Sequence, residues 1–278
     1  MPYFINKRIE VSRSTPYRLS IQADLNGFSF AVLDDATASC RMLHHHPLPV
    51  FTDYNELYTE TALWCKKFLP TNVPYSLAHC SFCSPFFTLV PDTVFVPEKA
   101  AQILASIHHI HDLDEVYYYP LPPLKAVCIY SIPNALATPI LKAVKKTRFY
   151  SVAIPLIKIA TSLPGHTRVL FYPHQDYLYL GLVREQQLLL CNAYEAPQVN
   201  TALYFLFLAL HQWQLNPESI LLYLAGMCSK PLIQLLSRYF PRIISLTDNN
   251  FRLPSQEMNM QYSLMFHPIP PCALSEDS

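Results

Sequence analysis

The chain has 278 residues, enough for one large domain or for two domains of ordinary size. Lys and Arg together number 20, as do Asp and Glu, and the lack of a basic patch argues against nucleic-acid binding. Only four residues are glycine, which excludes the Gly-rich phosphate loops of Walker-type and Rossmann-type nucleotide sites.

The hydropathy pattern predicts a cytoplasmic protein. The start of the sequence has no apolar run typical of a signal peptide. The most apolar segment, residues 201–210, is about half as long as the roughly 20 residues that span a bilayer. We therefore expect a buried helix there and no membrane span. The eight cysteines lie in apolar stretches and are expected to be reduced core residues.

Residues 1–16 are predicted to form an irregular arm, after which a sheet begins. Apolar and polar residues alternate in YRLSIQAD, a pattern typical of a strand. The pair Asn26-Gly27 that follows is a strong hairpin signal. The first three strands are therefore placed at 18–24, 28–34 and 40–48.

A helix and a fourth strand are expected next. Asp53 and Glu56 have the spacing of a capping box, so the helix begins after Asp53 and runs to about Leu69. Residues 75–83 have the composition of a strand. We interpret 84–120 as an insertion that contains a helix at 97–110. The first half then continues with a strand at 125–132, a helix at 134–146 and a strand at 149–155.

The second half repeats this order after a boundary at Pro164-Gly165-His166. The expected elements are strands at 167–174, 177–184 and 187–194, a helix at 198–214, a strand at 219–225, a helix at 229–240 and strands at 243–247 and 261–267. The chain is thus predicted to consist of the arm, a first domain at 17–164 that holds the insertion, and a second domain at 165–278.

This duplicated unit resembles the actin-like ATPase superfamily of ribonuclease-H-like folds. The whole chain resembles an uncharacterised bacterial family with that fold, over roughly residues 17–267. The resemblance rests on LSIQADLNGFSF, on RVLFYPHQDYLYLGLV with the following LLLCNAY, and on LLYLAG. It implies an α/β fold of two mixed-sheet domains related by internal duplication.

The resemblance also implies where a nucleotide would bind. In active members each of the two hairpin turns holds a phosphate, and a glycine pair in the second half packs on adenosine. The matching residues here are Asp24, Asn26 and Gly27 in the first turn, Asp176 in the second turn, and Gly226. Because Tyr177 stands where a small residue is expected, we predict a degenerate nucleotide cleft.

Two functional hypotheses follow. The first is a non-catalytic scaffold or protein-interaction protein that has no cofactor and binds another protein; a homodimer is compatible with it. The alternative is an ATP-binding member in which Asp24 and Asp176 place Mg²⁺. The aromatic run Tyr117-Tyr118-Tyr119 fits a docking surface as well as it fits an extended connector.

Three groups of residues raise the question of a metal site, and for each a structural role is the simpler interpretation. His44 and His46 share one face of a strand, His108 and Asp112 are four residues apart, and Cys80 and Cys83 form a lone C-x-x-C pair. A structural zinc ion needs four ligands, and no second pair has a matching spacing. We therefore predict that no metal is bound.

Overall fold

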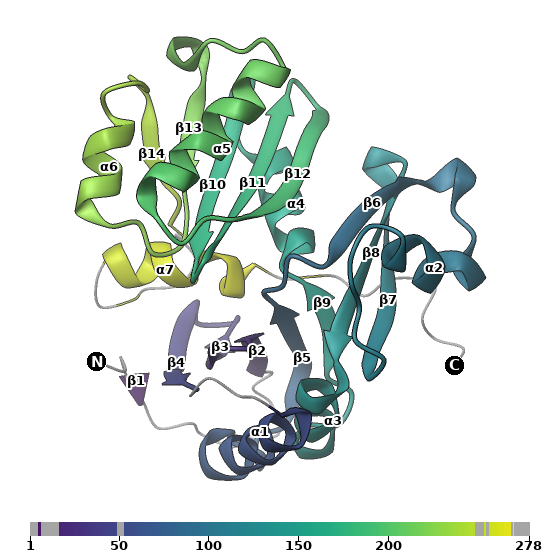
Figure 1. The fold of residues 1–278 in the computed structure, drawn as a ribbon. Helices are drawn as coiled ribbons and strands as arrows, with labels where there is room; N and C mark the ends of the chain where they lie inside the picture. Colours follow the sequence, from purple (N-terminus) through teal and green to yellow (C-terminus); the bar gives the residue numbers. More distant parts are fainter. Residues whose placement is uncertain are drawn as a thin grey trace. The chain divides into compact units, whose positions relative to one another are not determined.

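The computed structural model describes residues 5–6, 17–48, 53–247, 253, 256–267 and 269. The chain divides into two compact units, and the division between them along the main part of the chain falls between Val152 and Ala153. Figure 1 shows the helices and strands of both units. The sequence-based boundary at residue 164 would instead place the helix α4 (Ala153–Ser162) with the first half.

A mixed sheet of six strands forms the first unit. Its order is β1-β4-β3-β2-β5-β9. Strands β2, β3 and β4 form an antiparallel meander, and β5 and β9 continue the sheet in parallel with β2. The strands are β1 (Ile5–Asn6), β2 (Tyr17–Asp24), β3 (Gly27–Asp34), β4 (Ser39–Pro47), β5 (Tyr75–Phe82) and β9 (Arg148–Ser151).

The second unit contains a five-stranded sheet with the same connectivity. Its order is β12-β11-β10-β13-β14, with an antiparallel meander followed by two parallel strands. The strands are β10 (Thr167–His174), β11 (Tyr177–Arg184), β12 (Gln187–Glu195), β13 (Leu221–Leu224) and β14 (Ile243–Ser245). The predicted duplication of an α/β unit with a mixed sheet is therefore confirmed.

The two units share a backbone hydrogen bond at equivalent positions, in addition to the order of their strands. The first hairpin turn accepts a hydrogen bond at the Asn26 carbonyl from the Leu48 amide, 2.7 Å away. The second turn accepts one at the Asp176 carbonyl from the Ala196 amide, also 2.7 Å away. In both units the residue that follows the third strand is thus tied to the turn between the first two. This bond ends the meander and directs the chain toward the next helix.

Helices cover the sheets, and their ends follow local capping rules. The first unit has α1 (Tyr54–Phe68) and α3 (Asn134–Ala143); the second has α4, α5 (Val199–Gln212) and α6 (Lys230–Leu236). The Asp53 side chain accepts from the Asn55 amide, as expected for the N-cap of α1. Ser229 caps α6 by accepting from the Leu232 amide.

The predicted insertion is part of a separate antiparallel sheet. Its three strands have the order β6-β8-β7, with bounds β6 (Phe87–Pro91), β7 (Asp114–Leu121) and β8 (Ala126–Pro133). The helix expected at 97–110 is shorter, because a 3-10 turn at Pro97–Lys99 leads into α2 (Ala100–Ala105). Only Ala100 and Leu104 of α2 are buried, so little apolar surface supports a longer helix.

The prediction of a strand at 261–267 is wrong. This part of the chain lies in a helix, α7 (Gln256–Phe266). Its side chains from Tyr262 to Phe266 are all buried, so burial does not alternate as it would in a half-exposed strand. A short apolar run such as this one fits a buried helix and a buried strand equally well in sequence.

Aromatic side chains of the first unit join α1 to the sheet. Trp64 of α1 stacks on Phe28 with ring centroids 4.4 Å apart. His44 lies against both Phe30 and Phe68, with centroid distances of 5.5 and 4.4 Å. The pKa of His44 is lowered from 6.5 to about 4, chiefly by burial and to a smaller extent by the neighbouring His46 and His45.

The buried neutral His44 predicts a loss of stability in acid. The unfolded chain binds the proton near pH 6.5 and the folded chain only near pH 4, so stability is fully present above 6.5 and declines as the pH falls toward 4. The shift is worth at most roughly 3 kcal/mol. In urea titrations at pH 7 and pH 4.5, His44→Phe should lose less stability than the wild type, because the aromatic contacts remain without the titrating group. Equal losses in both proteins would contradict this account, and the exposed His166→Gln is the matched control.

Candidate functional site

The first hairpin turn joins β2 to β3 and is closed by its own residues. Asp24 is buried, and its Oδ1 accepts from the Asn26 amide at 2.6 Å, which forms a local Asx turn. Gly27 is buried as the first residue of β3. A Cβ at Gly27 would lie 2.9 Å from the His46 carbonyl oxygen, so this glycine permits the close approach of β4.

The second hairpin turn has the same length and a different set of side chains. His174 pairs with Tyr177 at the end of the ladder, as Asp24 pairs with Gly27 in the first turn. Asp176 is exposed and occupies the position of Asn26. The two aspartates that the sequence pairs as magnesium ligands are therefore not at equivalent positions. The equivalent of Asp24 is His174.

Tyr177 lies partly buried beside this turn. Burial raises the pKa of the Tyr177 hydroxyl, and the nearby carboxylates of Glu195 and Asp176 raise it further. Next to it, the Tyr172 hydroxyl lies 3.2 Å from Nδ1 of His174, and the two rings stack. Aromatic rings thus surround a turn that would hold a phosphate in an active relative.

The glycine at the end of β13 is enclosed by its own unit. Gly226 is buried with φ of 77°, and its amide donates to the Met260 carbonyl of α7 at 3.0 Å. A Cβ at this position would lie 2.6 Å from the Pro173 carbonyl oxygen and 2.7 Å from the Tyr172 ring. The glycine therefore lets the chain pass close to the end of β10.

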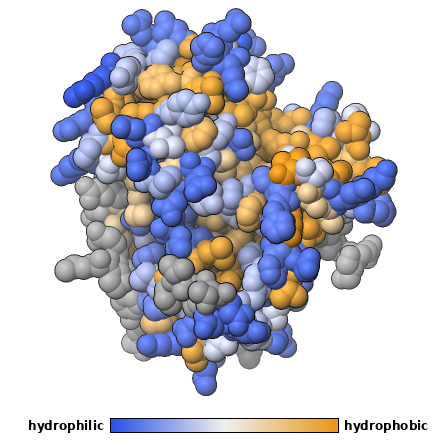
Figure 2. Space-filling model, in the orientation of Figure 1, coloured by the Kyte–Doolittle hydropathy of each residue, from blue (hydrophilic) through white to orange (hydrophobic). Residues whose placement is uncertain are grey.

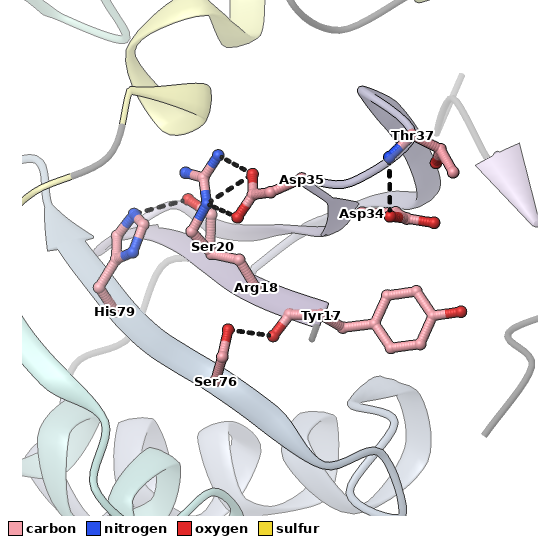
Figure 3. A network of polar contacts seen from close by, with 8 residues as sticks. All are labelled: Tyr17, Arg18, Ser20, Asp34, Asp35, Thr37, Ser76 and His79. Atoms are coloured by element: carbon pink, nitrogen blue, oxygen red, sulfur yellow. Dashed lines mark hydrogen bonds and ion pairs between the residues drawn. The ribbon is translucent and has the colours of Figure 1, made fainter. Parts of the chain in front are cut away.

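A network of polar contacts lies at the start of β2 (Figure 3). The Arg18 guanidinium donates to the Asp35 carboxylate at 2.9 Å. Thr37 and Arg41 donate to Asp34. Burial raises the pKa of Asp34, but these hydrogen bonds outweigh it and the pKa falls below the usual value.

Figure 3 also shows a serine and a histidine side by side on adjacent strands. Ser20 Oγ and His79 Nε2 are 3.0 Å apart, within the reach of a nucleophile and its base. Both residues have no exposed surface. A substrate therefore has no access to this pair, and it is a hydrogen bond across the core.

Arg168 of β10 matches Arg18 of β2 in sequence position but not in its contacts. Its guanidinium donates to the carbonyl oxygens of Ala160, Thr161 and Gly165, at 3.0, 3.0 and 2.5 Å. Two of these carbonyls end α4, where backbone acceptors otherwise lack partners. The two arginines are structural in both units.

The residues that raised the question of a metal site are packed in other ways. His44 and His46 both contact the Phe68 ring. Cys80 and Cys83 are buried free thiols, and burial raises the pKa of Cys80 well above its usual value. Within the described parts of the chain, no three or more His, Cys, Asp or Glu residues are grouped to hold a metal ion. No helix in those parts is long and apolar enough to cross a membrane.

The repeated meander, with two further parallel strands in each unit, is that of the actin-like ATPase fold. Comparison with known proteins gives the same class. The chain belongs to the family described as "Protein of unknown function (DUF3822)", whose model matches residues 6–243. No curated protein matches the chain.

Two solved structures illustrate the similarity. A Bacteroides thetaiotaomicron protein with actin-like ATPase fold and unknown function is 23% identical, with a TM-score of 0.76 over 92% of this chain and 98% of that chain. The PilM-PilN type IV pilus biogenesis complex contains a chain that is 14% identical, with a TM-score of 0.54 over 91% of this chain and 97% of that chain. At these identities the similarity shows the fold alone.

The packing around Gly226 predicts a large cost for any side chain there. Gly226→Ala combines a positive φ with a clash against a backbone oxygen, and we expect a loss of about 2 to 4 kcal/mol in the free energy of unfolding. Gly181→Ala is the comparison, because the three nearest atoms to its Cβ would all be side-chain atoms, from Leu156, Ala160 and Leu170, and because its φ is not positive. Urea denaturation of both variants measures the difference. A loss at Gly226 no larger than at Gly181 would contradict the close approach of Gly226 to Pro173 and Tyr172.

Proposed function

We propose that this protein is a non-catalytic actin-like scaffold of the cytoplasm that binds another protein and has a degenerate nucleotide site. The observation that carries the proposal is the state of the two glycines at the positions implied for nucleotide contact. Gly27 is packed against the His46 carbonyl, and Gly226 against Tyr172 and Pro173. The space beside each glycine is occupied by other atoms of this chain. A nucleotide therefore cannot approach these backbone positions as closely as it would need to.

The contents of the two turns support the same proposal. The Asp24 carboxylate already accepts a backbone amide within its own turn. The second turn offers exposed Asp176 next to Tyr177, whose ring adds bulk where a phosphate would sit. No lysine or arginine is within either turn, and two carboxylates without a cation repel a triphosphate.

The PilM-PilN complex gives independent support for a protein partner. There, a chain with the same fold is found in a complex for type IV pilus biogenesis. By analogy, the fold of this chain is suited to assembly with another protein.

The proposal predicts no binding of ATP with magnesium. The melting temperature should not change at millimolar ATP and Mg²⁺, because neither turn offers a free backbone cradle. A ligand at 100 times its Kd would add about 2.7 kcal/mol of stability, which a thermal-shift assay detects readily. Magnesium alone and ATP with a chelator serve as controls.

The alternative function has a defined signature in the same assay. If Asp24 and Asp176 place Mg²⁺, ATP with magnesium raises the melting temperature, and the rise disappears in Asp176→Asn, which removes an exposed charge without disturbing a buried contact. Asp24→Asn keeps an acceptor for the Asn26 amide and is the second variant. That result would replace the scaffold proposal with an ATP-binding protein.

A further inference from the structure

Strand β12 is an edge of the five-stranded sheet, and its outer side has no paired strand among the described residues. The strand is nine residues long, QLLLCNAYE, with no proline and with its one charge at the end. Every residue from Leu188 to Tyr194 is partly exposed, whereas β11 beside it is almost wholly buried. Long apolar edges of this kind are usually blocked, because they pair readily with other chains.

The direction of the backbone groups along β12 can be assigned. The Ala196 amide points back into the unit, where it donates to the Asp176 carbonyl. Backbone groups alternate along a strand, so those of Tyr194 and Asn192 face β11, and those of Glu195, Ala193 and Cys191 face the open side. In agreement, the Ala193 amide is held only by Oδ1 of the Asn192 side chain, at 2.9 Å.

In the first unit, the equivalent edge of the sheet is paired with a further strand. In the first unit, β4 corresponds to β12: both have nine residues and a register shift at the same point of the ladder. The short strand β1 pairs antiparallel with β4, with Ile5 opposite Leu43. Leu43 corresponds to Cys191 of β12. The edge strand of the first unit thus pairs with an antiparallel strand, whereas the equivalent strand β12 has no such neighbour among the described residues.

An aromatic patch lies beside the open edge. Tyr194 of β12 stacks on Phe205 of α5 with centroids 4.5 Å apart, and Tyr204 meets Phe205 edge to face at 5.3 Å. Tyr204 is 60% exposed, among the largest exposed fractions of any apolar side chain described. Figure 2 shows apolar residues gathered over the part of the unit that carries this helix. Exposed aromatic groups of this kind are typical of protein interfaces.

We propose that β12 is the interface for a second copy of this chain, which adds its own β12 in antiparallel orientation about a two-fold axis at Ala193. The residues that face the open side then match themselves, since Ala193 lies opposite Ala193 of the second copy and Cys191 opposite Glu195 of the second copy. No like charges meet across the axis. The aromatic patches of the two α5 helices flank the joined strands and supply apolar area that a five-residue ladder alone lacks.

The proposal predicts a dimer that depends on the outward amide of Ala193. Ala193→Pro removes this amide but no hydrogen bond to β11, so the fold is retained and pairing is blocked. Ala193→Ser keeps the amide and is the matched control. Analytical ultracentrifugation at micromolar concentrations should give a dimer for the wild type and Ala193→Ser, and a monomer for Ala193→Pro. Circular dichroism checks the fold of each variant.

Disulfide trapping tests the same axis without relying on the proline variant. Ala193→Cys places two thiols across the axis at the separation of paired strands, within the range that a disulfide spans. Mild oxidation should convert most of this variant to a covalent dimer, whereas Ser237→Cys, on an exposed turn after α6, should stay monomeric. A monomeric wild type, a dimer that survives Ala193→Pro with its fold intact, or equal trapping at both positions would overturn the proposal. None of these outcomes depends on nucleotide binding.

Discussion

The hydrogen bond that closes each three-stranded meander sets the geometry of the rest of the molecule. In both units an amide that follows the third strand donates to a carbonyl in the first hairpin turn, through Leu48 to Asn26 and through Ala196 to Asp176. This bond fixes where the edge strand ends and where the next helix begins. It also uses one backbone carbonyl of each turn as an acceptor within the same chain.

The chain has only four glycines, and this limits where its backbone can be approached closely. A nucleotide site of this fold needs backbone that a ligand can approach closely, and glycine is the residue that allows it. Here Gly27 and Gly226 are used for close approach of strand to strand and of strand end to aromatic ring. Glycines at these positions suggest a ligand site in the sequence, but in the structure they allow close internal packing.

The duplicated fold could be read from the sequence because its signals are local. The bounds of β10, β11 and β12 agree with the expected strands to within a residue, since two-residue turns separate regular apolar runs. Two features depend on contacts between distant residues and were not predictable. They are the separate sheet of β6, β7 and β8, and the helical state of α7, in which every side chain from Tyr262 to Phe266 is buried. The candidate site shows the same limit. The family resemblance paired Asp24 with Asp176, but Asp24 closes the first hairpin against Gly27 as His174 closes the second against Tyr177, so Asp24 and His174 hold the equivalent positions.

The separate three-stranded sheet also lengthens the loop that the first unit closes when its last two strands pair. Residues 83–147 lie between β5 and β9, whereas only 225–242 lie between the corresponding strands β13 and β14. Each doubling of a loop costs about 0.6 kcal/mol of closure entropy, so the first unit pays roughly 1 kcal/mol more to pair its last parallel strand. Pairings between residues distant in sequence form slowly. The second unit therefore has the shorter loop to close in its native sheet. In the first unit, prior formation of the β6-β8-β7 sheet would shorten the effective loop between β5 and β9.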